Sequence, residues 1–336
     1  MNISTTSQRY YPIETYFCFV HLENEMSLEV LPSYSLNNEW GKPSNIQTCE
    51  LEQDLFTKEI DVVWLSICEK RFYSVQKQVD IKYSNDNSQT LLIGMMPYGI
   101  ACFWLYEEKK SKVIGCYSGE EVKVDMKDFI SEEAQIKLSD YCISRIKCNE
   151  AIKENLLCYG LPLRTYFENL MKQFIYRYQI FLEKWKDKSD EIKWEKYKED
   201  TDKVPKFDYI EESLFDGTHD KLHDDGLLKY HEAGKPKKLA IKWHIKKTEY
   251  LAYFWFEDDR IKEVFDKFYG VHPDTKTDFI IRIDAENKKY ELALYRYGLK
   301  EAQVIPEDVY QLLVFKNKYE DYRSDNYTQE RGAWIW

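Results

Sequence analysis

At 336 residues and 40.5 kDa, the chain is long enough for two domains that each bury a core of their own. Hydrophobic residues make up 43% of it and aromatic residues 16%, which excludes an intrinsically disordered chain. Its formal net charge of -11 repels polyanions, which argues against nucleic acid as a partner and favours a basic protein.

The first part of the chain has the pattern of a series of strands. One strand is expected near Tyr16–Val20, where apolar and aromatic residues cluster. Gly41-Lys42-Pro43 leads to an apolar segment with a central tryptophan, Asp61–Ile67, and the aromatic strand Arg71–Val75 follows it. A further strand is expected at Lys112–Tyr117.

A run without charge extends from Ser88 to Tyr106 and approaches the length of a membrane-spanning helix. Met96-Pro97-Tyr98-Gly99 lies in its middle, with proline and glycine at the positions that a tight turn prefers. A membrane helix would have to accommodate these helix breakers. We therefore predict two buried strands joined by a turn, and no membrane span.

Helices are predicted in the middle of the chain, the first from a cap at Ser131 to about Lys147 and the second around Glu150–Leu157. A longer helix is expected to begin near Pro162, because eight apolar residues follow at offsets of three and four. These eight residues form an apolar stripe along one side of the helix, namely Phe167, Leu170, Met171, Phe174, Ile175, Tyr178, Leu182 and Trp185. A charged linker then continues to residue 206.

The last part of the chain repeats the order of patterns seen in the first. Gly234-Lys235-Pro236 leads to a strand with a central tryptophan, then to an aromatic strand and a pair of strands that form a hairpin. A short helix is predicted at Asp258–Tyr269, with Gly270 as its stop, and another is expected to open at Pro306. The three strand segments are Leu239–Ile245, Tyr250–Phe256 and Phe279–Arg296.

The repeat predicts an α+β fold of two related halves, each a mainly antiparallel sheet packed with helices. The expected boundaries are residues 1–158 for the N-terminal half, 159–206 for the long helix and charged linker, and 207–336 for the C-terminal half. Eight cysteines are scattered without a Cys-x-x-Cys pair, which favours reduced, buried thiols in a cytoplasmic protein. The first residues lack the basic start and apolar run of a secretory signal, which agrees with that location.

No established catalytic motif occurs, and we predict no catalytic residue and no cofactor. The alternative is a metal-dependent or small-molecule enzyme that uses His219 and His223, which a helical turn would place on one side together with nearby carboxylates. His231 lies just beyond them. The Glu of a His-Glu-x-x-His helix is missing, however, and Asp216-Gly217-Thr218 is a turn sequence.

Three parts of the chain resemble an uncharacterised bacterial family, domain of unknown function 2931. They are the segment Trp64–Tyr73, the turn Met96–Gly99 and the C-terminal stretch Phe315–Trp336. Some members of that family lie near toxin or secretion loci, so the resemblance implies a role beside such systems. It supplies no catalytic residues.

These observations lead to the hypothesis of an immunity-type protein, which neutralises a bacterial antagonistic toxin by steric occlusion. The partner would be a basic toxin or effector, attracted by acidic residues and anchored by tryptophans. An accessory protein of a secretion system is a further alternative. The predicted partner-binding residues are Asp208, Glu211, Glu212, Asp216, Asp220, Asp224, Asp225, Trp334 and Trp336.

Overall fold

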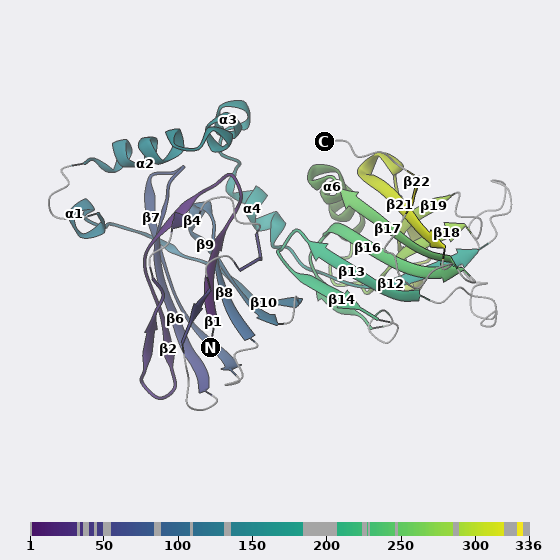
Figure 1. The fold of residues 1–336 in the computed structure, drawn as a ribbon, viewed down its shortest axis with the longest axis horizontal. Coiled ribbons are helices and arrows are strands. Elements are labelled where there is room, and N and C mark those ends of the chain that lie inside the picture. Colours follow the sequence, from purple (N-terminus) through teal and green to yellow (C-terminus); the bar gives the residue numbers. More distant parts are fainter. Residues whose placement is uncertain are drawn as a thin grey trace. The chain divides into compact units, whose positions relative to one another are not determined.

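The chain folds into two compact units, and each is described here by itself (Figure 1). Unit 1 consists of residues 1–172 with residues 216–219, and unit 2 consists of residues 173–215 and 220–336. The computed structural model describes residues 2–31, 34–35, 40–43, 46–49, 55–83, 89–107, 110–130, 136–183, 207–223, 227, 229–245, 248–284, 289–318 and 328–331.

Unit 1 consists of two sheets packed face to face. In the first sheet, β1 pairs in parallel with β8, and β8, β9 and β10 follow one another antiparallel, while β5 pairs with β1 at the other edge. In the second, β2 pairs with β6 and β6 with β7, with β3, β4 and β11 at the edges. The bounds are β1 Asn2–Ser7, β2 Ile13–Leu22, β3 Ser27–Glu29, β4 Tyr34–Ser35, β5 Gln47–Thr48, β6 Leu55–Ser66, β7 Arg71–Tyr83, β8 Gln89–Met95, β9 Ile100–Glu107, β10 Lys110–Ser118 and β11 Glu120–Val122.

The inner faces of these two sheets form one core, because side chains alternate along each strand. Ile93 and Phe103 of the first sheet meet Val62 and Trp64 of the second. Four helices follow in the chain, and α1 and α2 supply Phe129 and Cys142 to a smaller cluster on the other side of β6 and β7. The helix bounds are α1 Met126–Phe129, α2 Leu138–Lys147, α3 Glu150–Tyr159 and α4 Arg164–Leu170.

The predicted hairpin between Ser88 and Tyr106 is confirmed, with the 3-10 turn Pro97–Gly99 between β8 and β9. Tyr98 has a φ of 62°, a left-handed conformation that is costly for a side chain other than glycine. The Glu69 carboxylate stabilises it, because it accepts hydrogen bonds from the Tyr98 amide at 2.6 Å and the Tyr73 hydroxyl at 2.8 Å.

Cys102 and Cys116 lie directly opposite each other on β9 and β10, and they form a disulfide. The prediction that all cysteines are reduced is therefore wrong for this pair. The reason is the cross-strand register, which brings together two thiols that are 14 residues apart in the sequence. Cys18 and Cys142 are free and buried, as predicted, whereas Cys148 and Cys158 are free but exposed, so the prediction of buried thiols is wrong for these two.

Unit 2 is also a pair of packed sheets, one with β13, β16, β17, β21 and β22 and the other with β15, β12, β18, β19 and β20. A short strand, β14, follows β13 in the chain, and its first residue, His219, belongs to unit 1. The bounds are β12 Phe174–Glu183, β13 Phe207–Leu214, β14 His219–Leu222, β15 His231–Ala233, β16 Pro236–Ile245, β17 Thr248–Phe256, β18 Thr277–Asp284, β19 Tyr290–Arg296, β20 Glu301–Ile305, β21 Tyr310–Lys318 and β22 Thr328–Arg331.

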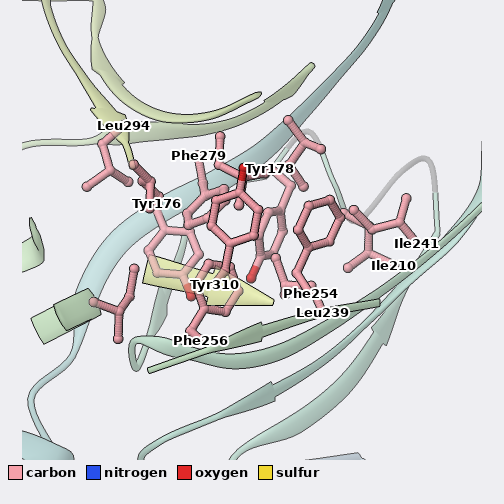
Figure 2. Close-up of a cluster of buried hydrophobic side chains, with 14 of the residues drawn as sticks. Tyr176, Tyr178, Ile210, Leu239, Ile241, Phe254, Phe256, Phe279, Leu294 and Tyr310 are labelled. Atoms are coloured by element: carbon pink, nitrogen blue, oxygen red, sulfur yellow. The ribbon is translucent and has the colours of Figure 1, made fainter. Parts of the chain in front are cut away.

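The core of unit 2 is rich in aromatic residues, which come from both sheets (Figure 2). Tyr178 and Phe279 belong to one sheet and Phe254 to the other, and Figure 2 shows their rings close together. The predicted helix Asp258–Tyr269 is confirmed as α6, and it contributes Phe265 to the same core. The other predicted hairpin, Phe279–Arg296, is confirmed as β18 and β19.

Seven strands of unit 1 pair in the same order as seven strands of unit 2. The parallel pair β1 with β8 corresponds to β12 with β18, and each second strand continues into a hairpin and a further antiparallel strand. The antiparallel series β2, β6, β7 corresponds to β13, β16, β17. The order of patterns in the sequence thus corresponds to a repeated order of strand pairings.

The predicted α+β class is wrong, because strands dominate both units and the described residues contain five α-helices, α1 to α4 and α6. The helix expected from Pro162 ends at Leu170, and β12 replaces its second part. The helix expected at Pro306 is a single 3-10 turn, Glu307–Val309, followed by β21. The expected cap at Ser131 and the charged linker, residues 186–206, lie outside the described residues. No helix in the described part of the chain is both long enough and apolar enough to cross a membrane.

Candidate functional site

One face of unit 2 brings imidazole, carboxylate, ammonium and aromatic groups together. Along β16, Leu239, Ile241 and Trp243 enter the core, so the residues between them project to the opposite side of the sheet. The register places His244 opposite Glu249 and Lys238 opposite Trp255 on that side. We call this surface the outer face, and it comprises Asp208, Tyr209, Glu211, Lys238, Lys242, His244, Glu249, Leu251, Tyr253, Trp255 and Phe315.

Three rings form an aromatic strip on the outer face, namely Tyr253, Trp255 and Phe315. The rings of Tyr253 and Trp255 are stacked with their centroids 5.3 Å apart, and Phe315 meets Tyr253 edge-on at 6.0 Å. The ammonium of Lys238 lies 4.8 Å from the Tyr253 ring centroid and 5.5 Å from that of Trp255. Partial burial, with a smaller contribution from the charge of Glu211, raises the pKa of Tyr253. The strip is therefore a partly desolvated platform that carries a cation.

Beside this strip lies a polar cluster of Asp208, His244 and Glu249, and a β-bulge creates it. Phe207 is paired with Trp243 and Tyr209 with Lys242, so Asp208 is an extra residue in β13 without a partner in the register. A bulge lets two consecutive side chains project on one side of a sheet. Asp208 and Tyr209 consequently both reach the outer face.

The distances within the polar cluster are those of hydrogen bonds. The Nδ1 of His244 lies 3.0 Å from Asp208 Oδ2, and its Nε2 lies 3.3 Å from Glu249 Oε2. The side chain of Glu249 is only 3% exposed, and the ammonium of Lys242 lies 2.8 Å from its Oε2. Burial alone would lower the pKa of Lys242, but the hydrogen bond and the negative charge of Glu249 outweigh it and raise the pKa. Lys242 thus neutralises a buried carboxylate.

Tyr209 extends the polar cluster toward β14. The ammonium of Lys221 lies 3.6 Å from the Tyr209 ring centroid, and that of Lys242 lies 6.0 Å from it. The imidazole of His223 approaches the backbone carbonyl of Asp208, with Nδ1 at 3.1 Å from the oxygen. This end of the outer face therefore combines imidazoles, carboxylates and ammonium groups.

The residues predicted to form one acidic patch do not share one surface. Glu211 lies on the outer face and is exposed, whereas Glu212 points the other way, is 2% exposed and accepts a hydrogen bond from the Tyr178 hydroxyl at 2.6 Å. Adjacent residues of a strand project to opposite faces, which separates the two acids. Asp208 belongs to the polar cluster.

The remaining described acids of the predicted patch, Asp216 and Asp220, accept hydrogen bonds from nearby backbone amides. Asp216 is 0% exposed, and its carboxylate accepts a hydrogen bond from the Thr218 amide at 2.9 Å. The Asp220 carboxylate accepts one from the Lys221 amide at 2.6 Å. Asp224, Asp225, Trp334 and Trp336 lie outside the described residues. Of the predicted partner-binding residues, the structure thus places two, Asp208 and Glu211, on the outer face.

The histidines of the proposed metal alternative lie on a strand, β14, or just after it, and no helical turn joins them. Residues four apart in a strand are roughly 13 Å apart, so the spacing of His219 and His223 does not bring their imidazoles together. The imidazole of His231 lies 3.8 Å from the buried Glu212 carboxylate. The cluster with the spacing of metal ligands among the described residues is instead Asp208, His244 and Glu249.

The sequence contains a signal for His244 and Glu249, although neither residue belongs to a catalytic motif. Both residues fall in or beside segments that were predicted as consecutive strands, Leu239–Ile245 and Tyr250–Phe256. Joining these strands by a tight turn would have placed the two residues opposite each other. Asp208 carries no comparable signal, because a bulge is not visible in the alternation of residues.

Comparison of the chain with protein-family models, with curated proteins and with solved structures finds no match. The resemblance to domain of unknown function 2931 stays a prediction.

Proposed function

We propose that the chain is a protein-binding protein of the immunity type, which neutralises a bacterial antagonistic toxin by covering part of its surface. The outer face of unit 2 is the proposed contact surface. The observation that carries this proposal is the aromatic strip of Tyr253, Trp255 and Phe315, together with Lys238, whose ammonium lies against the Tyr253 and Trp255 rings. Tyrosine and tryptophan are enriched among the residues that dominate binding energy at protein interfaces.

The strip is well suited to binding because its strands hold it in place. β17, which carries Tyr253 and Trp255, is paired along its length with β16 on one side and with β21 on the other. A tyrosine or tryptophan side chain has two rotatable bonds, so little conformational entropy is lost when a partner immobilises it. A preorganised surface of this kind supports tight binding without a large rearrangement.

Charge would act at two distances. The net charge of -11 attracts a basic partner from afar and speeds its association. The outer face itself carries both signs, with Lys238 and Lys242 beside Glu211 and Asp208. A mixed pattern of this kind fixes the orientation of the partner more than it adds affinity.

Co-expression of the chain with the product of the neighbouring gene tests the proposal, with co-purification and protection of growth as the readouts. We expect a stable complex and rescue from toxicity. Trp255→Ala and Tyr253→Ala should each weaken binding by about 2 kcal/mol or more, which is roughly 30-fold in Kd.

Phe56→Ala is the matched control, because Phe56 is a 38% exposed aromatic residue on β6 of unit 1. It should leave binding unchanged. Absence of both binding and protection would remove the immunity-type function. If Phe56→Ala weakened the complex and the outer-face variants did not, the function would stand and the proposed contact surface would be wrong.

A further inference from the structure

We infer that Asp208, His244 and Glu249 form a binding site for a divalent transition-metal ion, with zinc as the best-fitting ion. The inference goes beyond the proposed protein binding and is independent of it. Three adjacent strands supply the ligands, β13 through its bulge, β16 and β17.

The ligand chemistry favours a transition metal over calcium or magnesium. One imidazole nitrogen and two carboxylate oxygens suit zinc and its neighbours, whereas calcium and magnesium prefer oxygen ligands alone. One ligand atom from each of the three residues can be chosen so that all lie within 4.8 Å of one another. Ligands at about 2.1 Å from a tetrahedral ion are separated by roughly 3.4 Å, so rotation of the side chains completes the site.

Burial makes one of these ligands dependent on a nearby cation. Glu249 has a side-chain exposure of 3%, and a carboxylate removed from water is unfavourable unless a positive charge is close. Lys242 supplies that charge at 2.8 Å. A metal ion would take over this role, and the ammonium of Lys242 would be released toward the Tyr209 ring, which it already approaches at 6.0 Å.

The strand scaffold keeps the three side chains together before an ion arrives. His244 and Glu249 face each other across the β16–β17 hairpin, and His244 already contacts both carboxylates. Sites on paired strands are positioned more rigidly than sites on loops. Since zinc takes four ligands, three protein ligands leave one position for water or for a group of another molecule.

Titration of Zn²⁺ into the metal-free full chain, without a histidine tag, tests the site by calorimetry. We expect about one equivalent to bind at this site with an increase in the melting temperature, because an ion that binds the folded state stabilises it. His244→Gln and, as a second variant, Asp208→Asn should each weaken this binding by at least about tenfold. Lys242→Met should strengthen it by about tenfold, because the competing ammonium is gone.

His272→Gln is the control, since His272 is an exposed imidazole of unit 2 remote from the cluster in sequence. It should bind Zn²⁺ like the unmodified chain. The exposed thiols of Cys148 and Cys158 also attract zinc, so the comparison between variants decides the outcome. Equal Zn²⁺ binding by the unmodified chain and by folded His244→Gln and Asp208→Asn would overturn the inference. So would a Lys242→Met variant that binds no more tightly, or a preference for Ca²⁺ over Zn²⁺.

Discussion

Two glycines of unit 1 have similar positive φ angles but different surroundings. Gly41 has a φ of +77° and Gly160 a φ of +70°, so an added side chain is strained at both. A Cβ at Gly41 would lie 2.1 Å from the backbone carbonyl oxygen of Gly217, whereas nothing lies within 4 Å of a Cβ at Gly160. Alanine at Gly160 would therefore add backbone strain alone, whereas alanine at Gly41 would add both backbone strain and a steric clash.

Gly41→Ala should therefore lower the free energy of unfolding by about 3 kcal/mol or more, because the atoms it meets are backbone and cannot rotate away. Gly160→Ala should lower it by about 1–2 kcal/mol, which is the strain alone. Urea denaturation of both variants measures the difference. Equal values would contradict the close approach of Gly41 to Gly217.

The alternation of side chains between the two faces of a strand also explains why the predicted acidic residues do not share one surface. The sequence reveals how dense the acids are between residues 207 and 225, but it does not reveal which way each carboxylate points. Once residues 207–214 are known to form a strand, the opposite orientations of Glu211 and Glu212 follow directly. The position of Asp208 needs the bulge as well, and only coordinates reveal it.

At the scale of elements, α6 is the helix on which the core of unit 2 depends. Phe265 is fully buried, and its ring centroid lies 5.0 Å from that of Phe174 and 6.5 Å from that of Phe279. Phe265→Ala should lower the free energy of unfolding by about 3–5 kcal/mol, since it removes a large side chain from a packed core. Glu263→Ala, on the exposed side of the same helix, should change it by less than about 0.5 kcal/mol.

Equilibrium denaturation of the two helix variants measures this contrast. A loss of under about 1 kcal/mol in Phe265→Ala would mean that α6 does not pack as described. A similar large loss in both variants would instead point to the intrinsic stability of the helix, because Glu263 contributes nothing to the core.

The correctly predicted helix α6 has local signals at both of its ends. α6 combines acids in its first turn, a one-sided apolar stripe and Gly270 after its last residue. The helix expected from Pro162 rested on the spacing of apolar residues, and in its second part, Phe174–Leu182, only Arg177 and Gln179 are polar or charged. Such a segment also fits a period of two, and Phe174, Tyr176 and Tyr178 are indeed buried alternately in β12.

At the scale of the whole molecule, the sequence predicted the order of pairings better than the class of fold. The tryptophan strands, the aromatic strands that follow them and the hairpins correspond to strands that pair in the same order in both units. The parallel pairs β1 with β8 and β12 with β18 could not be predicted, because each joins segments far apart in the sequence. For the same reason, the sequence could not predict that Asp208 lies beside His244 and Glu249, because only the fold brings these three residues together.

Both units contain tyrosines whose burial raises their pKa, and unit 1 also contains such thiols. In unit 1, burial raises the pKa of Tyr11 and of Tyr141 to about 12 and that of Cys142 to about 11. In unit 2, burial and then the Glu212 charge hold the pKa of Tyr178 well above its ordinary value of 10.0. These groups keep their protons in the folded chain at a pH where the unfolded chain has lost them.

The stability of the molecule should therefore be constant up to about pH 9 and then fall steadily to about pH 12, as unfolded thiols and then unfolded phenols ionise. Denaturant titrations at several pH values, with the absorbance of ionised tyrosine as a second readout, measure this dependence. Tyr178→Phe should be less stable by about 1–3 kcal/mol at neutral pH, because it removes the hydrogen bond to a buried carboxylate. Its stability should also fall less steeply above pH 10, since one titrating group is gone. A flat profile between pH 9 and 11 in the unmodified chain would contradict the burial of these groups.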